Sequence, residues 1–236
     1  ELKKIYHTPV VNVPTNKPPR RDELPVQVFA CDNAKWSAIV AEVIQIRDAG
    51  RPVLIGTRSI DKSQIVSDLL AKQDVPHDVL NANNLAREAE IVAAAGDVGR
   101  VVVATNMAGR GTDIKVTDAA LNNGGLHVIC TEIHESSRID RQLIGRCGRQ
   151  GDPGSFRQFV SLEDEILEQG MGTDKAEKLR NRRFHSPHQL LRLSKLFHLK
   201  PVSGVRPGSI AKQSKPSGEE RDAGEPRFSV RHLDDE

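Results

Sequence analysis

The stretch Arg100-Val-Val-Val-Ala-Thr-Asn-Met-Ala-Gly-Arg-Gly-Thr-Asp-Ile114 carries the strongest fold signal in the sequence. Its first part, residues 100–105, is a continuous apolar and β-branched run, and its second part is polar and glycine-rich. A strand without polar alternation is typical of a parallel sheet that helices cover on both faces. Ligands bind such sheets at the carboxyl ends of the strands, so the polar segment after residue 105 is a candidate binding loop.

Similar apolar runs alternate with helical patterns on both sides of this stretch. We predict strands at 52–56, 79–80, 126–130 and 156–160, and helices at 33–49, around 65–70, at 86–95 and at 137–146. This alternation favours an α/β fold with a doubly wound parallel sheet and flanking helices over residues 33–162. Residues 1–32 are proline-rich and predict an extended linker or an edge segment that enters the domain. Residues 163–200 predict a helical extension, and residues 201–236 predict a disordered tail.

The composition narrows the classes of partner. The net charge of +2 is nearly balanced, and aromatic residues are only 3% of the 236 residues, which argues against a nucleic-acid stacking platform. Cys31, Cys130 and Cys147 have no metal-ligand spacing, so we expect no metal site, a reducing cytoplasmic compartment, and small buried or half-buried thiols. No apolar run is long enough to span a bilayer. Because residue 1 is Glu rather than Met, we expect a piece of a longer protein.

The glycine-rich segment offers groups that suit a nucleotide. Gly109 and Gly111 allow the backbone to approach a ligand closely, Arg110 offers a guanidinium to phosphate, and Asp113 can accept hydrogen bonds from a ribose. Taken alone, the segment fits a glycine-rich turn with a surface Arg–Asp pair equally well.

A second motif, Gln142-Leu-Ile-Gly-Arg-Cys-Gly-Arg-Gln-Gly-Asp152, favours the nucleotide interpretation. Arg146 and Arg149 are three residues apart, a spacing that places both on one side of a helix or its last turn. Paired arginines stabilise the charge on a transferring phosphoryl group. We expect Gly145 and Gly148 to keep the neighbouring surface flat for a partner. The alternative is a basic helix end that interacts with the helix dipole.

The two motifs, in this order late in a parallel sheet, resemble the second motor domain of superfamily-two helicases. Further segments resemble SecA, the ATPase that pushes preproteins through the Sec channel; they include Asn81-Ala-Asn, Arg87-Glu-Ala-Glu-Ile-Val, Gly124-Gly-Leu-His-Val-Ile, His134-Glu-Ser and Ser161-Leu-Glu-Asp-Glu. The resemblance covers about residues 5–167 and implies a RecA-like fold. The chain departs from the family pattern at Ile133, Ser137 and Ile144, where SecA usually has Arg.

The resemblance implies that ATP lies between two RecA-like domains. The first domain supplies the phosphate loop and holds Mg²⁺, and this sequence contains no Gly-x-x-x-x-Gly-Lys-Ser/Thr loop, so we expect the isolated chain to be inactive. This chain would be the second domain. Arg110, Arg146 and Arg149 would reach the phosphates, and Asp113 the sugar. Gly109, Gly111 and Thr112 would complete the nucleotide contact, and Gln142 would couple it to domain closure.

The resemblance also implies three partners: a first RecA-like domain in the same or another chain, the Sec channel, and a preprotein. Two other functions stay open, a superfamily-two nucleic-acid helicase domain and a truncated, non-catalytic paralogue that acts as an interaction module. The basic segment Lys178-Leu-Arg-Asn-Arg-Arg183 fits contact with an anionic membrane surface, and it fits packing onto the motor domain equally well. We therefore expect a cytoplasmic protein that can lie peripherally at a membrane.

Three further interpretations concern single positions. His127 lies within an apolar run and is predicted to be a hydrogen-bonded core residue. His134 is predicted to orient the helix that carries the second motif. The cluster Glu163-Asp-Glu165 is predicted to begin a solvated helix rather than to form a catalytic carboxylate site.

Overall fold

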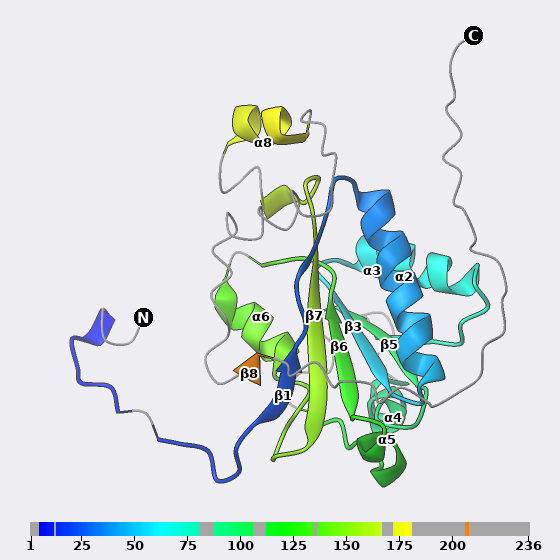
Figure 1. The fold of residues 1–236 in the computed structure, drawn as a ribbon, viewed down its shortest axis with the longest axis vertical. Helices are drawn as coiled ribbons and strands as arrows, with labels where there is room; N and C mark the ends of the chain where they lie inside the picture. Colours follow the sequence, from blue (N-terminus) through cyan, green and yellow to red (C-terminus); the bar gives the residue numbers. More distant parts are fainter. Residues whose placement is uncertain are drawn as a thin grey trace, which may run out of the picture.

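The computed structural model describes residues 5–11, 13–80, 87–105, 112–134, 136–166, 172–180 and 206–207. Their centre is an eight-stranded sheet in the order β4-β5-β3-β6-β7-β1-β8, with β2 also pairing with β7 (Figure 1). Every strand pair is parallel. The strands are β1 (Arg20–Glu23), β2 (Gln27–Phe29), β3 (Val53–Thr57), β4 (Asp78–Leu80), β5 (Val101–Thr105), β6 (Leu126–Cys130), β7 (Pro153–Ser161) and β8 (Arg206–Pro207). The predicted doubly wound parallel sheet is thus confirmed.

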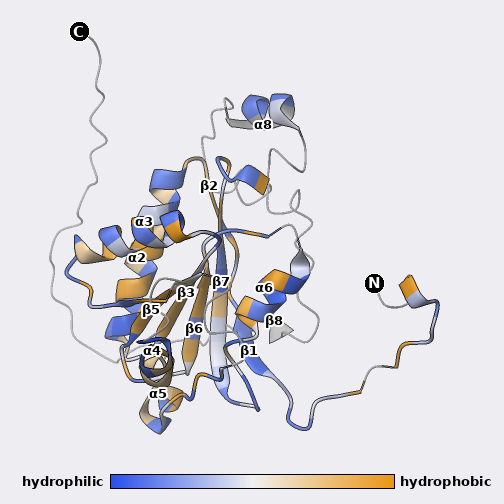
Figure 2. Cartoon of the chain, turned by 180° about the vertical axis from the view of Figure 1, so that it is seen from behind, coloured by the Kyte–Doolittle hydropathy of each residue, from blue (hydrophilic) through white to orange (hydrophobic). Residues whose placement is uncertain are grey.

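Helices cover both faces of this sheet. The helices of the described residues are α2 (Asp32–Asp48), α3 (Ile60–Ala71), α4 (Glu88–Ala94), α5 (Asp118–Asn122), α6 (Ser137–Ile144) and α8 (Thr173–Arg180), and four of them form the layers on the two faces. The hydrophobic side chains of α2 and α3 pack on one face, and those of α4 and α6 pack on the other. The central strands β3, β5 and β6 are accordingly hydrophobic, whereas the helices also carry hydrophilic residues (Figure 2).

Strand β5 shows why the apolar runs are continuous. Side chains of a strand point alternately to the two faces of the sheet. Val101 and Val103 face the core under α2 and α3, while Val102 and Ala104 face the core under α4 and α6. All five residues of β5 are buried, so neither face leaves room for polar alternation.

The proline-rich N-terminal region contributes the edge of the sheet. Strand β1 pairs with the first part of β7, and β2 pairs with its last part. Between them the Leu24 amide still donates to the Phe156 carbonyl at 2.9 Å, although Pro25 interrupts the ladder. The sequence predicts either an extended linker or an edge segment for this region, and residues 20–29 form an edge segment.

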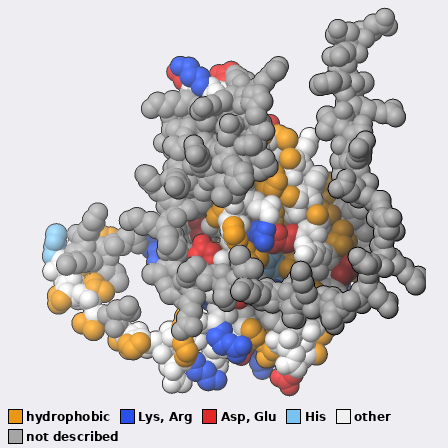
Figure 3. Space-filling model, in the orientation of Figure 1, with side chains coloured by type: hydrophobic (Ala, Val, Ile, Leu, Met, Phe, Trp, Pro, Cys, Tyr) orange, Lys and Arg blue, Asp and Glu red, His pale blue; other side chains and the backbone are white. Residues whose placement is uncertain are grey.

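The C-terminal predictions are only partly covered by the described residues. The segment 163–166 and helix α8 lie in the predicted helical extension, and Arg206 and Pro207 pair with β1. The rest of residues 181–236 lies outside the described part. On the face shown in Figure 3, the positive and negative side chains of the described residues are interspersed, as the nearly balanced net charge suggests.

Candidate nucleotide-facing site

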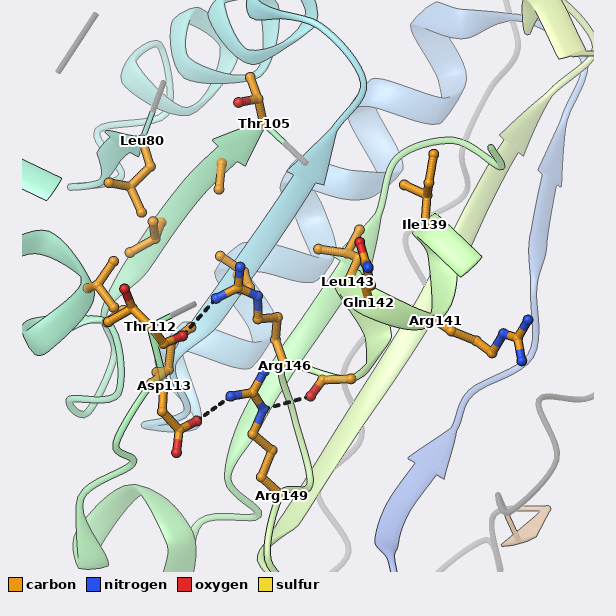
Figure 4. Close-up of a pocket in the computed structure, with 17 residues that line it drawn as sticks. Leu80, Thr105, Thr112, Asp113, Ile139, Arg141, Gln142, Leu143, Arg146 and Arg149 are labelled. Atoms are coloured by element: carbon orange, nitrogen blue, oxygen red, sulfur yellow. Dashed lines mark hydrogen bonds and ion pairs between the residues drawn. The ribbon is translucent and has the colours of Figure 1, made fainter. Parts of the chain in front are cut away.

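A cavity of about 480 Å³ opens between α4 and α6 (Figure 4). Its floor is apolar and belongs to the sheet and α4, with contributions from Leu54, Val92, Val102 and Ala104. Its rim is polar and comes from two segments far apart in the sequence. One is the segment after β5, and the other is α6 with the turn that follows it; the rim residues are Thr112, Asp113, Gln142, Arg146 and Arg149.

A glycine in β3 sets how closely α6 approaches the sheet. Gly56 faces Leu143 of α6, and a Cβ built on Gly56 would lie 2.6 Å from Leu143 Cδ1 and 3.0 Å from Cγ, and closer still to Cδ2. Real Cβ atoms do not approach other carbon atoms this closely, so a larger residue at position 56 would force the Leu143 side chain, or α6 with it, to shift. Gly56 therefore allows the close approach to β3 of the helix that leads to Arg146 and Arg149.

The start of α6 is held by local hydrogen bonds. The Ser136 hydroxyl accepts from the Arg138 amide at 3.4 Å, as an N-cap residue does. The Asp140 carboxylate accepts from the backbone amide of His134 at 3.2 Å and lies 2.6 Å from its Nδ1. These contacts tie His134 directly to α6, in agreement with the prediction that this histidine orients the helix.

Both arginines of the second motif contact the end of the first motif. Arg146 Nη1 donates to the Thr112 carbonyl at 3.0 Å. Arg149 Nη1 contacts Asp113 Oδ1 at 2.5 Å, and its Nε donates to the Gly145 carbonyl at 2.8 Å (Figure 4). The Arg149 and Asp113 side chains are 37% and 46% exposed, so their ion pair is open to water and to ligands. Residues that are more than 30 positions apart thus form one charged rim.

The structure gives Gly148 a different role from the predicted flat surface. Its φ of +62° lies in the left-handed region, which residues with a Cβ adopt at a cost. A Cβ there would also lie 2.9 Å from the Cβ of Arg21, a residue of β1. Gly148 is therefore required by the turn after α6 and by the neighbouring strand of the same chain.

The predicted site residues divide into two groups. Thr112, Asp113, Gln142, Arg146 and Arg149 are brought together around the cavity. Gly109, Arg110 and Gly111 lie outside the described residues. Among the residues that are described, no group of three or more His, Cys, Asp or Glu side chains could hold a metal ion.

The sequence interpretation missed a buried charged cluster on the α2 side of the sheet. Lys35 is fully buried, and its ammonium pairs with Asp164 and, at 3.1 Å, with Asp32. Asp164 is 2% exposed, so the predicted solvated helix at residues 163–165 is wrong for this residue. One signal was available: Lys35 lies at helical spacing from Ile39 and Val43, which are the buried stripe of α2.

Burial dominates the electrostatics of this cluster. It raises the pKa of Asp164 from 3.8 to about 6, while Lys35 and the Ser161 amide oppose the shift and the charge of Glu132 adds to it. Glu132 is also 2% exposed, and its carboxylate pairs with Lys62 and lies 3.7 Å from Arg58 Nε. Neither oxygen of Glu132 makes a hydrogen bond of good geometry, so ionic attraction is what holds it.

Other buried polar and thiol groups have structural roles. His127 is fully buried between Ser155 Oγ, 2.7 Å from Nδ1, and Glu42 Oε1, 2.9 Å from Nε2, which confirms the predicted core histidine. Cys130 and Cys147 are buried and Cys31 is half-buried, as predicted. Ile144 and Ile133, which stand where the resembling family usually has Arg, are 0% and 9% exposed and belong to the core.

Solved structures with a similar fold define the class. The yeast DEAD-box splicing factor Prp28 matches 76% of this chain and 36% of that chain, with a TM-score of 0.53 and 19% sequence identity. The E. coli DEAD-box protein SrmB, in a complex with RraA, matches 73% of this chain and 99% of that chain, with a TM-score of 0.50 and 19% identity. At these identities the likeness establishes the fold, which is that of a RecA-like helicase domain.

Sequence comparison then gives the family. Residues 18–122 and 115–185 match the family described as the SecA P-loop domain. Protein translocase subunit SecA 2 of Rhodopirellula baltica is 59% identical over 198 residues, which are 84% of this chain and 30% of that protein. Protein translocase subunit SecA of Desulfotalea psychrophila is 56% identical over 167 residues, 71% of this chain and 20% of that protein. The chain therefore belongs to the SecA family.

The chain spans between a fifth and a third of the length of these relatives. In the part of the chain that the structure describes, no helix combines the length and the apolar character needed to cross a membrane.

Proposed function

We propose that this chain is the second motor domain of a SecA-type, ATP-dependent preprotein translocase. The observation that carries the proposal is the charged rim, in which Arg146 and Arg149 meet Thr112 and Asp113 at the mouth of one cavity. Such a rim presents two guanidinium groups and one carboxylate to a ligand that has both phosphates and hydroxyls. ATP is such a ligand, and membership of the SecA family supports it.

The proposed roles follow from the chemistry of each side chain. The guanidinium groups of Arg146 and Arg149 neutralise the charge that develops on the transferring γ-phosphoryl group. The Asp113 carboxylate accepts a hydrogen bond from a ribose hydroxyl. Gln142, on α6 at the same cavity, senses the bound state and passes it to domain closure. Arg110, Gly109 and Gly111 complete the site from the segment before Thr112.

The Arg149–Asp113 pair is the resting state of this rim. When nucleotide arrives, phosphate replaces the carboxylate as the partner of Arg149, and Asp113 is released toward the sugar. Opening the pair costs little, because exposed ion pairs contribute at most about 1 kcal/mol. The two charges therefore neutralise each other when no ligand is bound, and both remain available to a ligand.

The remainder of the ATP site comes from elsewhere. The phosphate loop, the Mg²⁺ ligands and the water-activating carboxylate belong to a first RecA-like domain, in the same or another chain. In this arrangement the isolated chain does not hydrolyse ATP, and closure of the two domains drives a preprotein through the Sec channel. Contact with an anionic membrane surface is part of the same proposal.

The proposal is tested by reconstituting the missing half. Residues 18–185 of this chain replace the matching segment of the R. baltica relative, and ATP turnover is compared with that of the isolated chain. We expect turnover from the graft and none from the isolated chain. Substantial turnover by the isolated chain would contradict the half-site. RNA-stimulated rather than preprotein-stimulated turnover of the graft would favour the helicase alternative.

A further inference from the structure

The segment that follows β7 is fastened to the start of α2. Cys31, the N-cap residue of α2, makes no side-chain capping bond. Instead Glu163 Oε2 accepts from the Asp32 amide at 2.7 Å, across 131 positions of sequence. The Leu162 amide donates to the Phe29 carbonyl at 2.9 Å, just before α2 begins. The helix start and the exit from the sheet are therefore one local structure.

Lys35 is the centre of this junction. Its buried ammonium lies between Asp164 and Asp32, with Asp32 Oδ1 at 3.1 Å, and it sits 4.6 Å above the ring of Trp36. Asp164 Oδ2 also accepts from the Ser161 amide at 2.7 Å. Asp32 Oδ1 has no hydrogen bond of good geometry, so it can take a larger share of Lys35. Lys35 can therefore pair with either of two carboxylates, Asp164 or Asp32.

The same junction reaches the loop that leads to α6. Glu132 follows β6 and is held by Lys62 of α3 and Arg58 after β3. Arg58 Nη1 also lies 3.9 Å from Glu165 Oε2 in the exit segment. The charged groups that face one another here come from α2, α3, the ends of β3 and β6, and the exit segment. They are Asp32, Lys35, Arg58, Lys62, Glu132, Glu163, Asp164 and Glu165, so carboxylates outnumber cations among them.

We propose that these residues form a proton-controlled clamp, in which protonation of Asp164 moves Lys35 to Asp32 and loosens the exit segment from α2. Glu132 and Asp164 are the two buried carboxylates of this group, each 2% exposed, and like charges in a poorly solvated site repel, which favours uptake of one proton. Asp164 is the member that takes it, since its burial raises its pKa to about 6, and the charge of Glu132 contributes to that rise. The β6–α6 loop is thereby coupled to the exit segment through the Glu132–Asp164 repulsion.

This inference goes beyond the proposed ATP role and does not depend on it. None of the clamp residues lines the cavity, and the clamp operates in the isolated chain. If experiments disprove the ATP role, the proposed clamp is unaffected. If they disprove the clamp, the proposed role of the charged rim is unaffected.

The single tryptophan reports on the clamp directly. Trp36 fluorescence of the 236-residue chain is followed from pH 7.5 to pH 5 in wild type, Asp164→Asn, Glu132→Gln and the control Asp48→Asn, whose exposed carboxylate lies at the far end of α2. We expect a transition near pH 6 in wild type and the control, a lower midpoint in Glu132→Gln, and no transition in Asp164→Asn. A transition that persists in Asp164→Asn, or that is missing from wild type, overturns the proposal.

A second measurement keeps the test decisive if Asp164→Asn does not fold. Amide hydrogen exchange of wild type is compared at pH 7 and pH 5.5 after correction for intrinsic rates. The Ser161 and Leu162 amides should lose protection at pH 5.5, while the Phe159 amide in β7 should not. Equal protection of all three at both pH values contradicts the clamp.

Discussion

The packing of α6 on β3 predicts that the effect of Gly56→Ala on the free energy of unfolding depends on whether Leu143 is present. Gly56→Ala adds a methyl group where Leu143 already stands. Overpacking a filled core typically costs about 1–3 kcal/mol. The φ of Gly56 is not positive, so alanine can adopt this backbone conformation. Because alanine loses less conformational entropy than glycine on folding, it offsets about 0.5–1 kcal/mol of that cost. We expect Gly56→Ala to lower the free energy of unfolding by about 1–2 kcal/mol.

Removing Leu143 should reverse that effect. Leu143→Ala alone should cost about 2–3 kcal/mol, near the lower end of the range for buried leucines, because this side chain is 8% exposed and borders the cavity. In the Leu143→Ala background the added methyl group has space. Gly56→Ala should then be neutral or stabilising by up to about 1 kcal/mol, a coupling of at least about 1 kcal/mol.

Urea unfolding followed by Trp36 fluorescence measures all four proteins of this cycle, since Trp36 is the only tryptophan and is 6% exposed. Leu70→Ala is the matched control, because Leu70 is fully buried in α3 on the opposite face of the sheet. Gly56→Ala should cost the same with or without Leu70. If the cost of Gly56→Ala is also the same with or without Leu143, the claim that Gly56 sets how closely α6 packs on β3 is refuted.

Two further predictions concern titratable groups of the core. Burial lowers the pKa of His127 below 6.5, so the unfolded chain binds a proton that the folded chain does not, and His127 makes the free energy of unfolding fall as the pH drops below about 6.5. His127→Gln should flatten that part of the profile in urea unfolding at pH 7 and pH 5.5; an unchanged slope would show that another group is responsible. Burial also raises the pKa of Cys130, and that of Cys147 to about 11, so a thiol reagent at pH 8 should modify Cys31 quickly and the other two only after denaturation. Fast modification of Cys147 in the folded chain would contradict its placement.

The sequence predicted the central strands well because their signal is local. Residues 126–130 are β6 as predicted, β5 begins one residue later than predicted, and β3 is displaced by one residue at both ends. Strand β7 is longer than predicted because it begins at Pro153-Gly154, a pair that usually marks a turn. Strands β1 and β2 are too short, and too close to Pro25, to give a pattern of their own. Only their pairing with β7 makes them strands.

The site could be predicted only in part, for a related reason. The residue types of the charged rim are visible in the two motifs, and the resemblance to SecA assigns them to one ligand. That Arg149 meets Asp113 rather than solvent depends on how closely α6 packs on β3 and on the turn at Gly148, which are tertiary features. The junction around Lys35 is also tertiary, because Asp164 is 129 positions away from it. A lysine in an apolar stripe indicates that a buried partner exists without indicating which one.

The central claim is that this chain supplies arginines to a nucleotide held by another domain. It is tested most directly by Arg149→Ala in the graft into the R. baltica relative, with Arg47→Ala in the last turn of α2 as control. The account predicts that kcat for ATP falls by at least about 100-fold in Arg149→Ala, as expected on removing a group that stabilises transition-state charge, and is unchanged in Arg47→Ala. ATP hydrolysis that survives Arg149→Ala at the level of the control would contradict it.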